Sequence, residues 1–141
     1  MRIVDLNVLL YAIDETSVHH RVAHGWLDRA LTGAAPVGFA WLVLAGFVRL
    51  ATHPSLSAAP HTVTTAMDIV DGWLGARTAQ VLHPGPGHAA LVRELLEAAG
   101  GAGNLVNDAH LAALAREHKA TVVSFDSDFG RFPGVRWERP A

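Results

Sequence analysis

The stretch Arg2-Ile3-Val4-Asp5 places an acidic residue directly after a short run of β-forming residues. The same order recurs near the other end of the chain, where Asp126 follows Thr121-Val122-Val123-Ser124-Phe125. A third aspartate, Asp108, stands at the head of a helix that opens Asn104-Leu105-Val106-Asn107. In open α/β sheets the ligand crevice lies outside the carboxyl ends of the strands. We therefore expect Asp5, Asp108 and Asp126 to meet at one edge of a parallel sheet.

The rest of the chain alternates helical and β-type segments. Apolar spacing of period 3.6 predicts amphipathic helices over residues 18–31, 63–74 and 91–99. Short β-type runs occupy residues 36–39, 78–82, 121–125 and 135–137. The longest apolar stretch, residues 37–48, predicts a buried strand that runs into a buried helix, and it is too short to span a bilayer. This alternation predicts an α/β fold with a parallel sheet.

Length, composition and charge narrow the class of protein. The 141 residues predict a single domain, residues 1–141. The chain has no cysteine, which fits a reducing cytoplasm, and its apolar start is broken at once by Asp5, so no signal peptide and no membrane partner are expected. A formal net charge of -2 lacks the strongly basic signature of a sequence-reading DNA binder. Any contact with nucleic acid must be local.

Clustered carboxylates repel one another unless a cation neutralises them, and a hard divalent metal is the natural occupant. Any single aspartate could instead cap a helix or a turn. The combination of three aspartates, each with an amide or hydroxyl side chain nearby, favours a metal site. Asn7 follows Asp5 by two residues, Asn104 precedes Asp108 by four, and Ser124 precedes Asp126 by two. Asp128 could join the ligands or cap the turn that follows.

Other chemistries find less support in the sequence. His20 and His24 have the spacing of a helical metal pair, but no cysteine or carboxylate-histidine motif completes a zinc site. No Gly-x-Ser-x-Gly, Gly-x-x-x-x-Gly-Lys or Gly-x-Gly-x-x-Gly motif occurs in the positions that hydrolases, P-loop proteins or dinucleotide-binding proteins require. A phospho-receiver module would need an acidic pair after the first strand, where Leu6 follows Asp5. A haloacid-dehalogenase-like phosphatase would need an aspartate in place of Asn7.

Three blocks of the chain resemble PIN-domain ribonucleases, specifically the VapC toxins of bacterial toxin-antitoxin pairs. They are residues 4–10, residues 104–115 and residues 123–137. The resemblance implies a three-layer α/β/α sandwich around a central, mainly parallel sheet. It also implies RNA cleavage dependent on Mg²⁺ or Mn²⁺, homodimerisation, and inhibition by a cognate VapB-type antitoxin whose tail covers the active site. The acidic positions of the family fall on Asp5, Asp108 and Asp126, with Asp128 as an occasional extra.

One position departs from the family pattern. VapC toxins usually carry a glutamate on the helix after the second strand, and Gly46 stands where that acid would fall. One interpretation is a catalytically weakened PIN domain that acts mainly as an antitoxin-binding or regulatory module. The other, which we favour, is natural divergence, with Asp14, Glu15 or bound water making up the missing ligand.

The expected reaction is metal-assisted hydrolysis of the RNA phosphodiester bond. Asp5, Asp108 and Asp126 are expected to hold the metal, and Asn7, Asn104, Ser124 and Asp128 to orient the ligands or their waters. Arg49 and Arg131 are the candidates for contact with RNA, because the planar guanidinium suits phosphate and stacks on bases.

Overall fold

The computed structural model describes residues 1–57 and 59–141 of the chain. A five-stranded sheet with the strand order β3-β2-β1-β4-β5 forms its centre, and every pair of neighbouring strands is parallel. Ile3 of β1 lies opposite Gly38 on one side and Val122 on the other. The strands are β1 Arg2–Val4, β2 Val37–Phe39, β3 Ala79–Val81, β4 Thr121–Val123 and β5 Arg136–Glu138. The predicted parallel sheet is confirmed.

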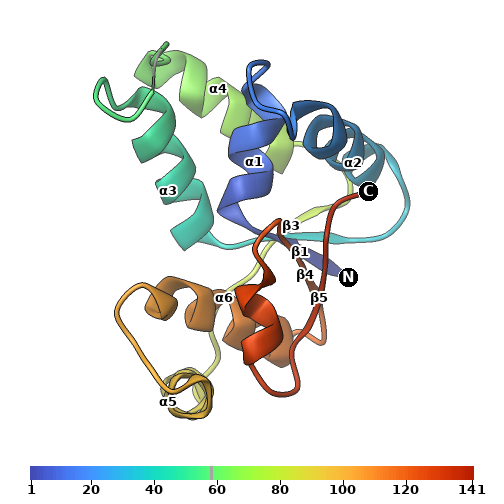
Figure 1. Cartoon of the computed structure of the whole chain (residues 1–141). Helices are drawn as coiled ribbons and strands as arrows, with labels where there is room; N and C mark the ends of the chain where they lie inside the picture. The colour runs from blue at the N-terminus through green and yellow to red at the C-terminus, as the bar shows by residue number, and fades with distance from the viewer. Residues whose placement is uncertain (58) are drawn as a thin grey trace.

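Helices cover both faces of the sheet (Figure 1). Helices α1 to α4 lie on one face, and α5 and α6 lie on the other, so the expected three-layer α/β/α sandwich is confirmed. The helices are α1 Leu6–Ile13, α2 His20–Thr32, α3 Trp41–Thr52, α4 Val63–Leu74, α5 His88–Ala99 and α6 Leu105–Glu117, and a short 3₁₀ helix, η1, spans Ser127–Arg131.

The apolar stretch 37–48 forms the buried centre that its composition predicts. All three residues of β2 are buried, and α3 buries Val43, Leu44 and Phe47 behind it. Phe47 packs edge-on against Trp73 of α4, with the ring centroids 4.7 Å apart. Burying a side chain of this size contributes roughly 1.5–3 kcal/mol. Among the described residues, no helix joins the length and the apolar character that crossing a bilayer requires.

Helix α6 carries no amphipathic signal in the sequence, since it buries the consecutive residues 111–115. A helix that is apolar on several sides shows no 3.6-residue stripe, because more than one face lies against the core. Helix α1 is short, and only Val8, Leu9 and Ala12 are fully buried along it. Periodicity therefore predicts α2, α4 and α5 better than α6, which carries Asp108.

The order of the strands determines where a ligand can bind. The chain adds β2 and β3 on one side of β1, then places β4 and β5 on its other side. Ligands of open α/β sheets bind at such a switch in strand order, beyond the carboxyl ends of the two central strands. Here these strands are β1 and β4, which end at Val4 and Val123.

Candidate active site

A hydrogen-bonded group joins the ends of β1 and β4. Asp5 caps α1 by accepting a hydrogen bond from the Leu6 amide at 2.7 Å, and it also accepts one from the Ser124 hydroxyl at 2.7 Å. The Asn7 side-chain amide donates to Asp5 at 3.1 Å and to Ser124 at 3.0 Å, and its oxygen accepts from the amide of Phe125 at 3.1 Å. The structure thus brings Asp5, Asn7 and Ser124 together, as the sequence predicts.

Three further carboxylates stand beside this group. One oxygen from each of Asp108, Asp126 and Asp128 lies within 4.8 Å of one from each of the others, and all three side chains are half-buried. The amide of Asp126 donates to the Ser124 hydroxyl at 2.9 Å, and its carboxylate caps η1 by accepting from the Asp128 amide at 2.8 Å. Asp128, which the sequence left between ligand and cap, is placed among the carboxylates themselves.

The electrostatics of the site oppose ionisation of all its acids at once. The pKa of Asp108 is raised to about 7, first by burial and then by the charges of Asp5, Asp126 and Asp128. Burial also raises the pKa of Asp5, against the lowering effect of its hydrogen bonds from Ser124 and Leu6. Hard carboxylate oxygens in this number are the donors that divalent oxygen-seeking cations take. The residues present therefore fit such an ion.

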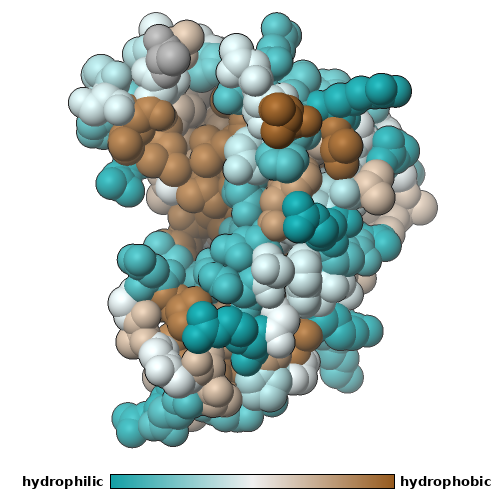
Figure 2. Space-filling view, in the orientation of Figure 1, coloured by the Kyte–Doolittle hydropathy of each residue, from teal (hydrophilic) through white to brown (hydrophobic). Residues whose placement is uncertain are grey.

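Asp5, Asp108 and Asp126 face a cavity of about 370 Å³ between α1, α3 and α6. Figure 2 shows a hollow with apolar walls at the left of the molecule, between α3 above and α6 below. Asn104 and Asp108 line the cavity together, as their four-residue spacing predicts, and Asn107 joins them. Asn107 was not predicted, although its place beside Asp108 in the first turn of α6 was a usable signal. The walls are completed by Asp5, Leu6, Asn7, Leu10, Leu42, Val43, Leu111 and Asp126.

Leu6 occupies the space beside Gly46. A Cβ atom added to Gly46 would lie 3.0 Å from Cδ2 of Leu6, closer than ordinary van der Waals contact. The side chain of Leu6 therefore faces the position from which the family's glutamate would project. Asp14 and Glu15 do not line the cavity, and Asp14 accepts hydrogen bonds from the amide and hydroxyl of Thr16 instead. An apolar contact stands where the additional acid was expected.

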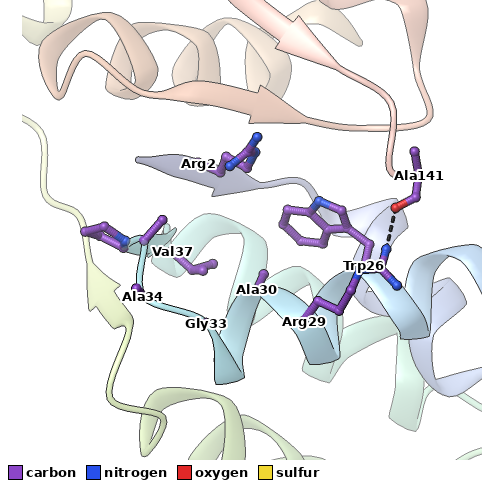
Figure 3. Close-up of a pocket in the computed structure, with 10 residues that line it drawn as sticks. Arg2, Trp26, Arg29, Ala30, Gly33, Ala34, Val37 and Ala141 are labelled. Carbon is purple, nitrogen blue, oxygen red and sulfur yellow. Dashed lines mark hydrogen bonds between the residues drawn. The ribbon is translucent and has the colours of Figure 1, made fainter.

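A second cavity, of about 240 Å³, lies at the opposite edge of the sheet, where β1 and β2 begin (Figure 3). Trp26 lines it, and Arg29 donates a hydrogen bond to the carbonyl oxygen of Ala141. Arg2 forms an ion pair with Glu138. Both arginines of this cavity already have partners within the chain, and its described lining contains no acidic side chain. This cavity therefore lacks the carboxylates that mark the candidate active site at the other edge of the sheet.

Comparison with known proteins places this geometry in a family. The model of the PIN domain family matches residues 2–135. Ribonuclease VapC37 of Mycobacterium tuberculosis is 54% identical over 99% of this chain and 97% of its own length. The chain belongs to the VapC group of PIN domains. Ribonuclease VapC31 of the same species is 41% identical over 99% of both chains.

Solved PIN-domain structures share the fold at lower sequence identity. A VapBC2 complex from Rickettsia felis, bound to a DNA fragment from its promoter, contains a chain with a TM-score of 0.71 and 22% identity over 98% of this chain and 97% of that one. VapC20 of Mycobacterium tuberculosis, described as a sarcin-ricin loop cleaving toxin, has a TM-score of 0.68 and 19% identity over 96% and 99%. The α/β/α architecture is therefore that of the VapC proteins.

The raised pKa of Asp108 predicts how the stability of the metal-free protein depends on pH. In the folded state this carboxyl holds a proton up to pH about 7, whereas its ordinary pKa is 3.8. The folded state therefore binds more protons in this range, and its stability falls as the pH rises from about 4 to 7. Asp108→Asn removes this term, so its unfolding free energy should match that of the wild type near pH 4 and exceed it increasingly up to pH 7. Urea unfolding in chelator across this range measures the difference, and a constant difference would contradict the assignment.

Proposed function

We propose that this protein is a metal-dependent endoribonuclease toxin of the VapC type, which cleaves RNA phosphodiester bonds. The observation that supports this most is the gathering of Asp5, Asp108 and Asp126 from three separate parts of the chain around one cavity, with Asp128 beside Asp108 and Asp126. The charges of Asp5, Asp126 and Asp128 raise the pKa of Asp108, and this crowding of acids is unfavourable unless a cation is bound. The identity with VapC ribonucleases supports the same activity.

We propose Mg²⁺ or Mn²⁺ as the cofactor, held by Asp5, Asp108 and Asp126 with Asp128 beside them. The chemistry that such an ion supplies when bound is activation of a water and neutralisation of the charge that develops on the phosphate. The protein's own hydrogen bonds orient the carboxylates that would hold the ion. Ser124 and Asn7 each donate a hydrogen bond to the Asp5 carboxylate, and Asn7 also donates one to Ser124. The capping bond from the Asp128 amide fixes Asp126. Carboxylates fixed in this way need little rearrangement to bind a cation.

The rim of the cavity suits both RNA and a protein inhibitor. Asn104 and Asn107 place amide groups beside the carboxylates, where they can hydrogen-bond to phosphate or ribose oxygens. Leu42 lines the cavity and is 40% exposed, and Trp41 and Val106, the chain neighbours of the lining residues Leu42 and Asn107, are 49% and 42% exposed. We propose that a cognate VapB-type antitoxin covers this apolar rim and that the protein acts as a cytoplasmic homodimer of single-domain subunits. Relatives of the same fold are found in VapBC complexes.

The alternative of a catalytically weakened, mainly antitoxin-binding protein rests on Gly46 alone. The packing of Leu6 against Gly46 favours natural divergence, because a recent loss of a glutamate would leave a space rather than a fitted side chain. We therefore propose that the acids present are sufficient for cleavage.

Cleavage of purified tRNA, rRNA and mRNA with and without chelator tests the proposed function. We expect cleavage to disappear in excess EDTA and to return when Mg²⁺ or Mn²⁺ is added, because the carboxylates act through a bound cation. The control is a preparation that lacks this protein and is carried through the same purification. Any RNA cleavage in that preparation comes from contaminating nuclease. Cleavage that persists in chelator would contradict metal dependence, and cleavage of no RNA in either metal would favour the weakened protein.

A further inference from the structure

Three aromatic rings from distant parts of the chain meet beside the carboxylate site. The ring centroid of Tyr11 lies 4.9 Å from that of His19 and 5.3 Å from that of Phe125. The centroids of His19 and Phe125 are 4.6 Å apart, so each ring contacts both of the others. The guanidinium of Arg139 lies over the Phe125 ring, 5.7 Å from its centroid. We call Tyr11, His19, Phe125 and Arg139 the aromatic platform. The three rings are half-buried and the arginine is exposed.

The aromatic platform is connected directly to the active site. Phe125 immediately precedes Asp126, and its amide donates to the side chain of Asn7 at 3.1 Å. Tyr11 follows Asn7 by four residues in α1, so both lie on the same face of that helix, about 6 Å apart along its axis. A strand of RNA whose phosphate reaches the carboxylates therefore has its neighbouring nucleotide within reach of the platform.

The polar ends of the platform have no partners within the described part of the chain. The Tyr11 hydroxyl and the ring nitrogens of His19 make no hydrogen bond to any described residue, and no buried side-chain nitrogen or oxygen there is left unpaired, so both ends reach solvent. Arg139 forms no ion pair or hydrogen bond with the residues described. By contrast, Arg131, one of the two arginines suggested by the sequence, donates to the carbonyl of Ala99 at 3.0 Å.

Packing alone explains these contacts incompletely. The rings hold the segment between α1 and α2 against the end of β4, which aliphatic side chains would also achieve. An aromatic cluster with a free hydroxyl, free imidazole nitrogens and a free guanidinium has the chemistry that binds single-stranded RNA, because bases stack on aromatic rings and arginine contacts phosphate. We propose that the aromatic platform binds a nucleotide of single-stranded RNA next to the bond that is cleaved. The proposal rests on the proposed ribonuclease function and assigns the substrate a single-stranded segment at this position.

Binding of a fluorescein-labelled single-stranded RNA to the metal-free full-length protein, measured by anisotropy in EDTA, tests the arginine. Arg139→Gln should weaken binding and reduce the slope of log Kd against log salt concentration by about 0.7, the value for one phosphate contact on a single strand. Arg77→Gln is the matched control, because Arg77 is an exposed arginine just before β3, at the opposite edge of the sheet. An unchanged salt slope for Arg139→Gln, or an equal change for Arg77→Gln, would overturn the proposal.

Two substitutions of Tyr11 separate stacking from folding. Tyr11→Leu should raise the Kd for RNA about 5- to 150-fold, the range for one stacked base, whereas Tyr11→Phe keeps the ring and should bind within about twofold of the wild type. Thermal unfolding of both variants shows whether the fold is kept. In cleavage assays Tyr11→Leu and Arg139→Gln should raise KM and leave kcat largely unchanged. Equal RNA binding by Tyr11→Leu and Tyr11→Phe would overturn the proposal.

The outcomes separate this proposal from the ribonuclease function. Wild-type cleavage with unchanged KM in both platform variants would overturn the platform and leave the ribonuclease intact. RNA binding that depends on Tyr11 and Arg139, in a protein that cleaves no RNA, would support the aromatic platform and contradict the proposed ribonuclease activity. If the two variants lose only the binding of antitoxin, the surface belongs to a protein partner and the proposal is overturned.

Discussion

Asp108→Asn is expected to lower Mg²⁺-dependent RNA cleavage at least ~100-fold while making the metal-free protein more stable at pH 7. Residues that only orient metal ligands cost 10–100-fold when they are replaced, so loss of a ligand itself should cost at least as much. Asparagine keeps the shape of the side chain and removes the charge. The pKa of Asp108 is raised to about 7, because the carboxyl is partly buried and faces Asp5, Asp126 and Asp128. Removing that charge should therefore relieve repulsion.

The opposite signs of the two effects make this prediction specific. A merely structural aspartate would lose stability together with activity. Cleavage rates with Mg²⁺ and thermal unfolding in EDTA, measured on the same preparation, give the two numbers. Asp71→Asn is the matched control, since Asp71 is an exposed carboxylate on α4 with no part in the cavity, and it should change neither. Retention of full cleavage by Asp108→Asn would remove Asp108 from the metal ligands.

Gly46→Glu is expected to destabilise the protein by about 1–3 kcal/mol without increasing cleavage. The added side chain must displace Leu6, whose Cδ2 atom lies 3.0 Å from the position of a Cβ at residue 46, and forcing extra atoms into a packed site costs this amount. A further carboxylate would also join acids that already repel one another. Urea unfolding and the cleavage rate with Mg²⁺ measure the two effects. An increase in cleavage would instead support the weakened-variant interpretation of Gly46.

Two comparisons isolate the contact with Leu6. In the double variant Leu6→Ala/Gly46→Glu, the loss in unfolding free energy should be smaller than the sum of the losses in the two single variants. The difference should be about 0.5–3 kcal/mol, because the two positions share one space. Gly72 provides the matched glycine, since it lies in α4 and an added Cβ would meet nothing within 4 Å. Gly72→Ala should therefore raise the unfolding free energy by about 0.5–1 kcal/mol through helix propensity, and Gly46→Ala should raise it by less. Equal gains would show that Leu6 does not restrict residue 46.

The strands and the carboxylate edge could be predicted from local patterns. Strands β1 and β4 are short β-forming runs that end just before Asp5 and Ser124, and parallel pairing brings their carboxyl ends to one edge. The place of Asn7 and Ser124 at this edge also follows from spacing, because each lies within two residues of an acid, whereas the hydrogen bond between them depends on the pairing of β1 with β4. The proposal that these residues bind metal still depends on the experiments above.

Other parts of the site could not be found in this way. Helix α6 shows no amphipathic stripe, because its residues 111–115 are all buried, so its length and orientation were invisible to periodicity. The aromatic platform joins residues 11, 19, 125 and 139, which no spacing rule connects. The role of Leu6 beside Gly46 was equally hidden, since the two residues lie on different helices.

The amino-acid sequence by itself determined the short strands, the amphipathic helices α2, α4 and α5, that the sheet is parallel, and that Asp5 and Asp126 follow its two central strands. These properties are local, since they follow from side-chain alternation, chain punctuation and the shared direction of the strands. Only the tertiary structure decided that Asp128 joins the acids, that Leu6 lies against Gly46, and that the pKa of Asp108 rises to about 7. The reason is physical: packing and electrostatic repulsion depend on distances through space, and folding sets those distances between residues that are remote along the chain.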